Sequence, residues 1–137
     1  MVVAAPDVVL RMRQFFWLPV SHNIIANKGG SMTAYVIATM VIHDPQTYLQ
    51  YTELTPPLVA RHGGKFLTRG DKVDTYEGDT FTERMVLLEF PDRDKVYAWL
   101  KDPEYVAASE FRKAASVCRI LIQEGASNTG DPDPKVG

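Results

Sequence analysis

The chain has 137 residues, the size of one domain, and its contents of 45% hydrophobic and 23% charged residues lie near the averages of globular proteins. A net charge of −2 gives no electrostatic reason to expect a nucleic acid or a membrane as partner, and no apolar stretch reaches the roughly 18–20 residues of a membrane span. Cys118 is the only cysteine, so an internal disulfide is excluded and we expect a soluble cytoplasmic protein.

Residues 1–31 precede the predicted domain. They end in the sequence Asn-Lys-Gly-Gly-Ser at 27–31, which is typical of a flexible hinge. We therefore assign residues 1–31 to an N-terminal extension outside the domain. An alternative interpretation makes them an arm that docks on a partner subunit through Phe15, Phe16 and Trp17, because neighbouring exposed aromatic residues favour burial.

The predicted domain covers residues 32–125 and begins with a strand at 35–42, where β-branched residues alternate with others. Asp44 followed by Pro45 predicts the start of a helix, because aspartate caps helix N-termini and proline is favoured at the first position. Thr55, which precedes two prolines, predicts an interruption that caps the helix again. Gly63 and Gly64 predict its end.

Two strands are predicted next, at about 65–69 and 83–90, with an extension of the first over 72–76 as an open alternative. Asp92 begins a second helix, and Asp102 with Pro103 repeats the cap-and-proline pattern before further helix at 105–115. A last strand is predicted at 117–123. Residues 126–134 offer no side chain able to anchor them, so we expect a flexible tail over 126–137.

The predicted order β-α-β-β-α-β is that of an α+β, ferredoxin-like fold, with an antiparallel sheet, the first and third strands central, and both helices on one face. The alternation of residues in the first strand indicates what covers the other face of the sheet. Ala34, Val36, Ala38, Met40 and Ile42 form an apolar set for the helix side, and the opposite set remains mostly apolar. We therefore predict a homodimer that buries this second face, sheet on sheet.

Several short motifs at joint spacing resemble the family called domain of unknown function 1330, a branch of the dimeric α/β-barrel superfamily. The resemblance covers residues 33–125 and rests on Tyr48, Tyr51, Gly63-Gly64, Arg69-Gly70, Glu77-Gly78, Arg84, Glu89-Phe90, Trp99, Pro103 with Tyr105, Arg112 and Glu124-Gly125. Membership implies the ferredoxin-like fold and dimerisation, so the resemblance implies that two copies form a dimeric α/β barrel. It implies no established activity.

The charged residues of the middle strands suggest a site for an anion. Arg69 and Arg84 stand on adjacent strands, and Glu89 lies near the end of the third. The arginines would bind an anionic substrate while Glu89, as a catalytic residue, transfers a proton. The alternative is that Glu89 only pairs with an arginine to satisfy a half-buried charge.

His62 and three tyrosines have two interpretations each. His62 is a candidate catalytic base, or a residue that complements the negative end of its helix. Tyr51 and Tyr35 are candidate substrate-binding residues, and Tyr48 shares a helix face with Tyr51, yet such tyrosines are more often core residues. Cys118 alternates with Ile120 and is predicted to be a small buried residue.

Three functional hypotheses follow. The first, motivated by the resemblance to the superfamily, is a cofactor-independent isomerase, lyase or oxygenase that acts on a small organic acid or phenolic compound by proton transfer. The second is a non-catalytic or stress-related dimer that binds a small anionic ligand, and the third is an assembly module. No metal or cofactor is expected, because the histidines lack ligand spacing and the glycine pairs lack a nucleotide-binding pattern.

Overall fold

The computed structural model describes residues 32–70, 72–125 and 129–130. The predictions for residues 1–31, including the docking role of Phe15, Phe16 and Trp17, lie outside the described residues, as does most of the predicted tail. Within the described ranges, no helix combines the length and the apolar character needed to cross a membrane.

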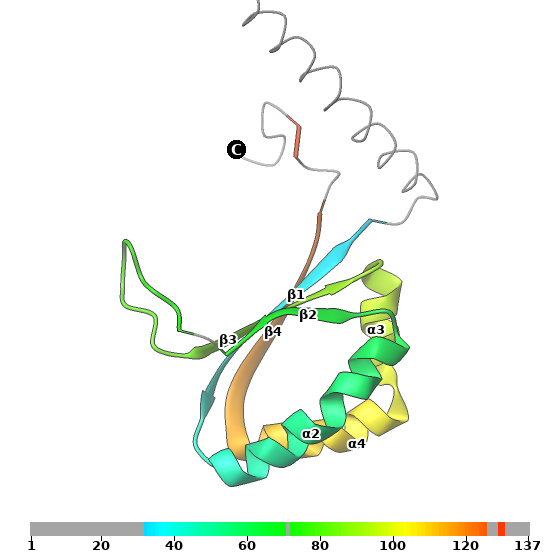
Figure 1. Ribbon diagram of the computed structural model, residues 1–137, viewed down its shortest axis with the longest axis horizontal. Helices are drawn as coiled ribbons and strands as arrows, with labels where there is room; N and C mark the ends of the chain where they lie inside the picture. The colour runs from blue at the N-terminus through cyan, green and yellow to red at the C-terminus, as the bar shows by residue number, and fades with distance from the viewer. Residues whose placement is uncertain (1–31, 71, 126–128, 131–137) are drawn as a thin grey trace, which may run out of the picture. The chain divides into compact units, whose positions relative to one another are not determined.

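A four-stranded antiparallel sheet forms one layer of the domain (Figure 1). Its strands are β1 (Ala34–Ile42), β2 (Lys65–Arg69), β3 (Arg84–Phe90) and β4 (Ser116–Glu124), in the spatial order β2-β3-β1-β4. The first and third strands are central, as predicted. Register between them pairs Met40 with Arg84 and Tyr35 with Glu89.

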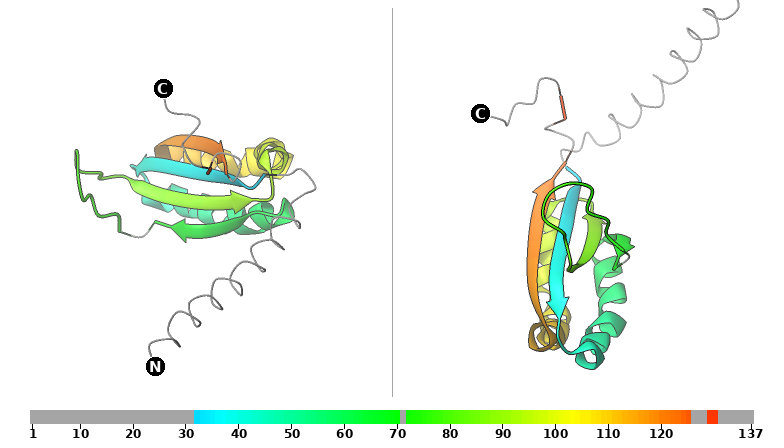
Figure 2. Two further views of the ribbon diagram at one scale, coloured as in Figure 1. Left: turned by 90° about the horizontal axis from the view of Figure 1, so that it is seen from above. Right: turned by 90° about the vertical axis from the view of Figure 1, so that its left-hand side faces the viewer.

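The second layer consists of three helices on one face of the sheet (Figure 2): α2 (Pro45–Arg61), α3 (Arg93–Lys101) and α4 (Pro103–Ala115). The capping predictions are confirmed, since Asp44, Asp92 and Asp102 each accept a hydrogen bond from a backbone N–H in the following turn. Asp102 also divides the predicted second helix into α3 and α4. The α+β, ferredoxin-like prediction is correct.

Aromatic side chains join the two layers. Phe90 of β3 stacks on Trp99 of α3 with ring centroids 5.2 Å apart, and Trp99 meets Tyr105 of α4 at 4.5 Å. Tyr105 in turn contacts Tyr51 of α2 edge to face at 6.1 Å. Aromatic pairs of this kind add about 0.5–1.5 kcal/mol each to the burial of their area. They fix the three helices relative to the sheet.

The opposite face of the sheet carries no helix, and its side chains are largely apolar. The alternation of β1 places Ala34, Val36, Ala38 and Met40 in the core, as predicted. The other face exposes large hydrophobic side chains on β1 and β4, namely Tyr35, Val41, Val117 and Leu121. We call these four residues the open sheet face.

The predicted interruption at Thr55 is wrong, because α2 runs unbroken through Pro56 and Pro57. Each proline removes a hydrogen bond to the carbonyl four residues earlier. Those carbonyls belong to Thr52 and Glu53, on the less buried side of the helix, where water can satisfy them. Thr55 instead donates its hydroxyl to the carbonyl of Tyr51 at 2.6 Å.

The alternative extension of β2 over 72–76 is also wrong. Gly70 donates its N–H to the carbonyl of Met85 at 2.9 Å, and its φ of 75° then turns the chain away from the sheet. The residues from 72 to 83 form a loop that projects beyond the sheet (Figure 1). This loop connects Arg69 to Arg84, so it brings two arginines to one end of the sheet.

Candidate functional site

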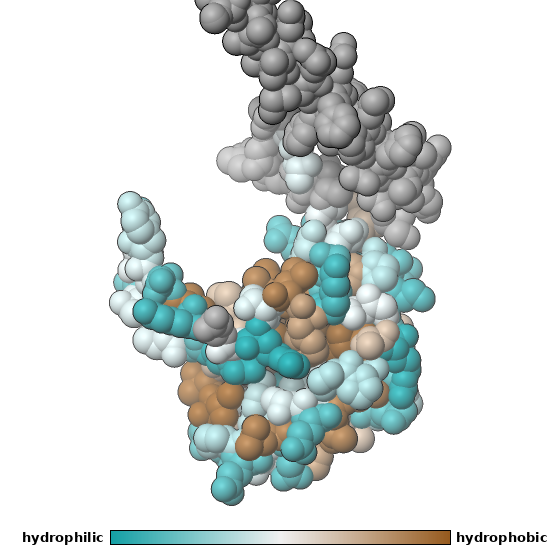
Figure 3. Space-filling model, in the orientation of Figure 1, coloured by the Kyte–Doolittle hydropathy of each residue, from teal (hydrophilic) through white to brown (hydrophobic). Residues whose placement is uncertain are grey.

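A groove of about 550 Å³ opens where the first two turns of α2 cross the ends of β2 and β3. Its volume lies within the range of small-molecule sites. Both layers line it, with Ile42, Pro45, Tyr48, Leu49, Thr52, Arg69 and Arg84. The space-filling view shows apolar residues gathered over the end of β1 and the start of α2, where Val41 and Leu49 are exposed (Figure 3).

The two arginines reach the groove because they lie at the same end of the sheet, on its helix side, Arg69 as the last residue of β2 and Arg84 as the first residue of β3. Arg69 pairs with Val86 across the β2–β3 ladder and its guanidinium lies 4.2 Å from the centre of the Phe66 ring. Arg84 is the first residue of β3, and its guanidinium lies 5.8 Å from the centre of the Tyr48 ring. The site therefore presents two cations against aromatic faces.

The guanidinium of Arg84 is only partly satisfied. Its Nε is buried without a hydrogen-bond partner, and neither Arg69 nor Arg84 makes an ion pair with any described residue. A Cβ at Gly70 would overlap the Arg84 guanidinium, so the glycine makes room for it. Arg84 lines the open groove without an ion-pair partner among the described residues, so this arrangement is suited to an added anion.

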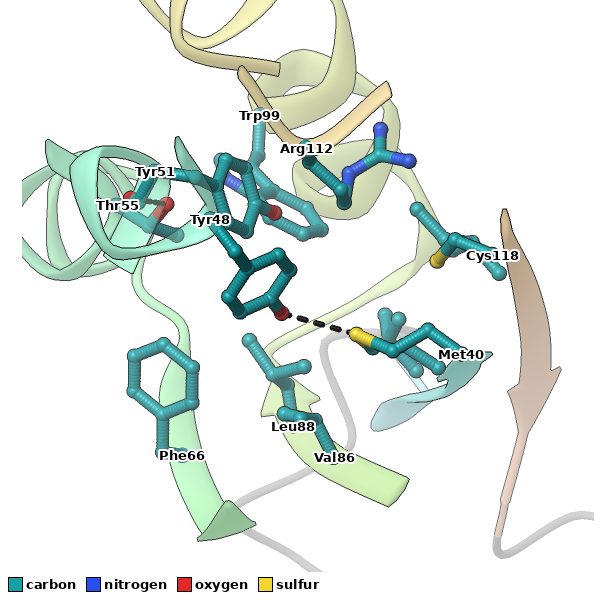
Figure 4. Close-up of a pocket in the computed structure, with 13 residues that line it drawn as sticks. Met40, Tyr48, Tyr51, Thr55, Phe66, Val86, Leu88, Trp99, Arg112 and Cys118 are labelled. Atoms are coloured by element: carbon teal, nitrogen blue, oxygen red, sulfur yellow. Dashed lines mark hydrogen bonds between the residues drawn. The ribbon is translucent and has the colours of Figure 1, made fainter. Parts of the chain in front are cut away.

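A second, inner cavity lies between the helices and the sheet behind Tyr48 (Figure 4). Its volume is about 30 Å³, which is room for one or two water molecules. Most of its wall is apolar, from Val36, Ala38, Met40, Phe66, Val86, Leu88 and Ile120, and the rest comes from Tyr48, Tyr51, Thr55, Trp99, Arg112 and Cys118. Tyr48 lines both the cavity and the groove.

The phenols of the site stay neutral at physiological pH. The hydroxyls of Tyr51 and Tyr105 share a hydrogen bond of 2.7 Å, and burial raises the pKa of each phenol. Burial, then the neighbouring Tyr51, raises the pKa of Tyr48, and the charge of Arg84 opposes this rise. These groups are hydrogen-bond donors, since their pKa values lie far above the range of a general base.

Arg112 and Trp99 add two more unsatisfied donors. Arg112 Nε and Trp99 Nε1 are buried and have no hydrogen-bond partner among the described residues. The Arg112 guanidinium lies 5.6 Å from the centre of the Tyr51 ring. Burial raises the pKa of the adjacent Cys118 thiol, so Cys118 is no ready nucleophile.

The structure brings three of the six predicted site residues together. Arg69 and Arg84 line the groove, and Tyr51 lines the cavity behind it. Tyr35 lies apart from them, since it belongs to the open sheet face at the other end of β1.

Glu89 differs from its predicted placement, because it does not lie beside an arginine. It stands five residues after Arg84 on β3, which places it on the other face of the sheet and roughly 17 Å along the strand. Its ion pair is with Lys65, at 3.6 Å. Glu89 therefore pairs with an exposed lysine, whereas the alternative interpretation gave it an arginine as partner.

His62 lies at the C-terminal end of α2, whereas the groove lies at the N-terminal end. The 17 residues of α2 span about 25 Å, so His62 is remote from Arg84. Its Nε2 lies 2.8 Å from Asp102. Within the described part of the chain, no three His, Cys, Asp or Glu residues are grouped as a metal site.

Sequence reasoning did not assign Arg112, Trp99 or Tyr105 to the site. They come from α3 and α4, and no strand or helix periodicity connects them to Arg84 on β3. The available signal was their presence in the motif set shared with the family, because polar or aromatic residues that recur together often surround one pocket.

Solved structures of similar fold were found, although no curated protein matches the chain significantly in sequence. A protein of unknown function from Rhodopseudomonas palustris has a TM-score of 0.61 and 17% identity, over 77% of this chain and 92% of its own. SnoaB, described as a cofactor-independent oxygenase from Streptomyces nogalater, has a TM-score of 0.53 and 14% identity, over 74% of this chain and 99% of its own.

A third similar structure is described as a dimeric ferredoxin-like protein of unknown function from Thermobifida fusca. Its TM-score is 0.52 at 16% identity, over 70% of this chain and 93% of its own. At these identities the likenesses establish the fold. The sequence model of the family described as Domain of unknown function (DUF1330) matches residues 33–126, and the chain belongs to that family, as the resemblance predicted.

Proposed function

We propose that the protein binds a small organic acid or phenolic compound in the groove beside Tyr48. The observation that carries this proposal is the guanidinium of Arg84, which lines the groove and makes no ion pair with any described residue. A planar guanidinium binds a carboxylate or phenolate through charge-assisted hydrogen bonds. Arg69 stands in the same groove and adds a second positive charge.

The remaining lining of the groove suits the apolar body of such a ligand. Ile42, Leu49 and the Tyr48 ring provide apolar and aromatic surface beside the two guanidinium groups. A few polar groups in a mostly apolar concavity are typical of small-molecule sites. A small acid with an aromatic or aliphatic body therefore fits better than a fully polar ion.

Calorimetric titration with benzoate tests the proposal, with neutral benzamide as the ligand control. We expect Arg84→Gln to weaken benzoate binding by about tenfold or more, since a charged hydrogen bond is worth about 1.5–3 kcal/mol. Arg93→Gln removes the same charge from an arginine paired with Glu124 at the other end of the sheet, and serves as the matched control. Equal affinities in the two variants would refute the acid site at Arg84.

Cofactor-independent turnover of the bound acid is the second candidate function. The fold is similar to that of SnoaB, which is described as a cofactor-independent oxygenase. Guanidinium groups stabilise the negative charge of an enolate or phenolate that develops on a substrate. The described groove residues include no carboxylate or imidazole, so the phenols near Tyr48 would act as neutral donors. Incubation with a mixture of organic and phenolic acids, followed by mass spectrometry over time, separates turnover from simple binding.

A second copy of the chain is the proposed partner of the open sheet face. Large apolar side chains exposed side by side on a sheet favour burial against a matching surface. One structure of the same fold is described as dimeric. Because this face is opposite the helices, dimerisation would leave the groove of each protomer accessible.

A further inference from the structure

Tyr48 is a partition between the groove and the inner cavity. Its side chain lines both spaces, and it is only 5% exposed. Figure 4 shows its hydroxyl directed toward the sulfur of Met40, to which it donates a hydrogen bond of 2.9 Å. A thioether is a weak acceptor, so the loss of this bond adds little to the cost of rotating the ring.

Behind the partition, two buried donors in the described part of the chain lack an acceptor. Trp99 is 2% exposed, yet its Nε1 has no hydrogen-bond partner among the described residues, and the same holds for the buried Nε of Arg112. Both residues line the cavity, whose 30 Å³ cannot hold an organic group. The groove in front, at 550 Å³, can hold one.

We propose that Tyr48 is a gate whose outward rotation joins the two spaces for an aromatic acid that carries an oxygen opposite its acid group. The acid group rests on Arg84, and the distal hydroxyl or carbonyl oxygen accepts hydrogen bonds from Trp99 and Arg112. A flat aromatic ligand fits the space that the Tyr48 ring leaves, because that ring is also flat. This inference rests on the proposed function, since it extends the acid site at Arg84.

The partition on which the gate depends can be tested without a ligand. The chain has two tryptophans, so Trp17→Phe leaves Trp99 as the only tryptophan, and excitation beyond the absorption of tyrosine makes it the reporter of the cavity. We expect weak quenching by acrylamide in this parent protein and a quenching constant about threefold higher after Tyr48→Ala, because the partition is removed. Tyr48→Phe keeps the ring and should keep Trp99 protected.

Leu49→Ala is the matched control, because Leu49 lines the groove without lining the cavity. If Tyr48→Ala exposes Trp99 no more than Leu49→Ala does, the gate is refuted. Circular dichroism verifies folding, and Tyr48→Leu, which keeps apolar bulk but loses the aromatic ring, replaces Tyr48→Ala if that variant unfolds.

The ligand class is tested by calorimetry with 4-hydroxybenzoate, benzoate and phenol. We expect 4-hydroxybenzoate to bind about tenfold more tightly than benzoate, which is about 1.4 kcal/mol, and Trp99→Phe to abolish this preference while benzoate affinity stays. A preference that is absent, or that survives Trp99→Phe, would overturn the inner site. Failure of benzoate itself to bind would instead overturn the proposed function, so the two failures are distinguishable.

Discussion

His62 and Asp102 fasten the end of α2 to the junction of α3 and α4, with His62 Nε2 2.8 Å from Asp102 Oδ2. The same carboxylate oxygen accepts from Arg61 at 2.9 Å, and the other oxygen caps α4 by accepting from the N–H of Glu104. Asp102 is 8% exposed. The histidine therefore belongs to a structural polar cluster that connects all three helices.

This cluster predicts that His62→Ala lowers stability and leaves ligand binding unchanged. Removal of the imidazole leaves a buried carboxylate oxygen with one partner fewer, so we expect the thermal unfolding midpoint to fall by a few degrees. Calorimetry with benzoate should give the affinity of the parent protein. His43→Ala, at an exposed histidine, is the control for stability. Impaired binding or turnover in a folded His62→Ala protein would contradict this prediction and show that His62 belongs to the functional site.

Asp102 also predicts a loss of stability in acid. Its pKa is lowered, first by the hydrogen bond from His62 and further by the N–H of Glu104 and the charge of Arg61. Because the folded pKa is below the unfolded value of about 3.9, the stabilisation is complete above that pH and is lost as the pH falls through the folded pKa. Urea unfolding between about pH 2 and 6 measures the loss, and Asp102→Asn should flatten the dependence across this window.

Alanine substitutions at Gly70 and Gly78 test whether ligand binding depends on the position of the Arg84 guanidinium. Both have positive φ, 75° and 92°, so alanine at either costs about 1–2 kcal/mol of backbone strain. A Cβ at Gly70 would also overlap the Arg84 guanidinium, whereas Gly78 has open space around it. We expect similar destabilisation by Gly70→Ala and Gly78→Ala, but about tenfold weaker benzoate binding only in Gly70→Ala. Equal binding would show that Arg84 need not occupy this position.

Strand periodicity and capping patterns were sufficient to predict the fold. Asp44-Pro45 and Asp102-Pro103 begin α2 and α4 as expected, because capping is a local interaction. The predicted interruption at Thr55 was wrong because the course of α2 there depends on tertiary packing and not on a local interaction. Tertiary packing of Tyr51, Leu58 and Val59 outweighs the local disfavour of two prolines, and the lost bonds fall on the outer side of α2.

The site was predictable only in part, because it depends on contacts between distant elements. Arg69 and Arg84 could be placed together, since one loop joins adjacent strands. The separation of Glu89 from Arg84 follows from their odd spacing, a signal present in the sequence once the strand is assumed. The contribution of Trp99 and Arg112 depends on how α3 and α4 lie over the sheet, which no local pattern specifies.

The open sheet face predicts self-association that one charge can disrupt. Leu121 is 51% exposed on this face, beside Ile37 of β1. A lysine there would be buried without a partner in a sheet-on-sheet dimer, so we expect Leu121→Lys to weaken dimerisation by at least about 30-fold, or about 2 kcal/mol. Sedimentation over a dilution series measures this change.

Leu54→Lys provides the matched control, because Leu54 is an exposed leucine of α2, on the helix side of the sheet. It introduces the same charge and should leave the dimer intact. The effect of Leu121→Lys would then come from its place on the open sheet face and not from the added charge. A parent protein that sediments as a monomer at all concentrations would overturn the dimer. It would also mean that the apolar side chains of β1 and β4 remain in contact with water.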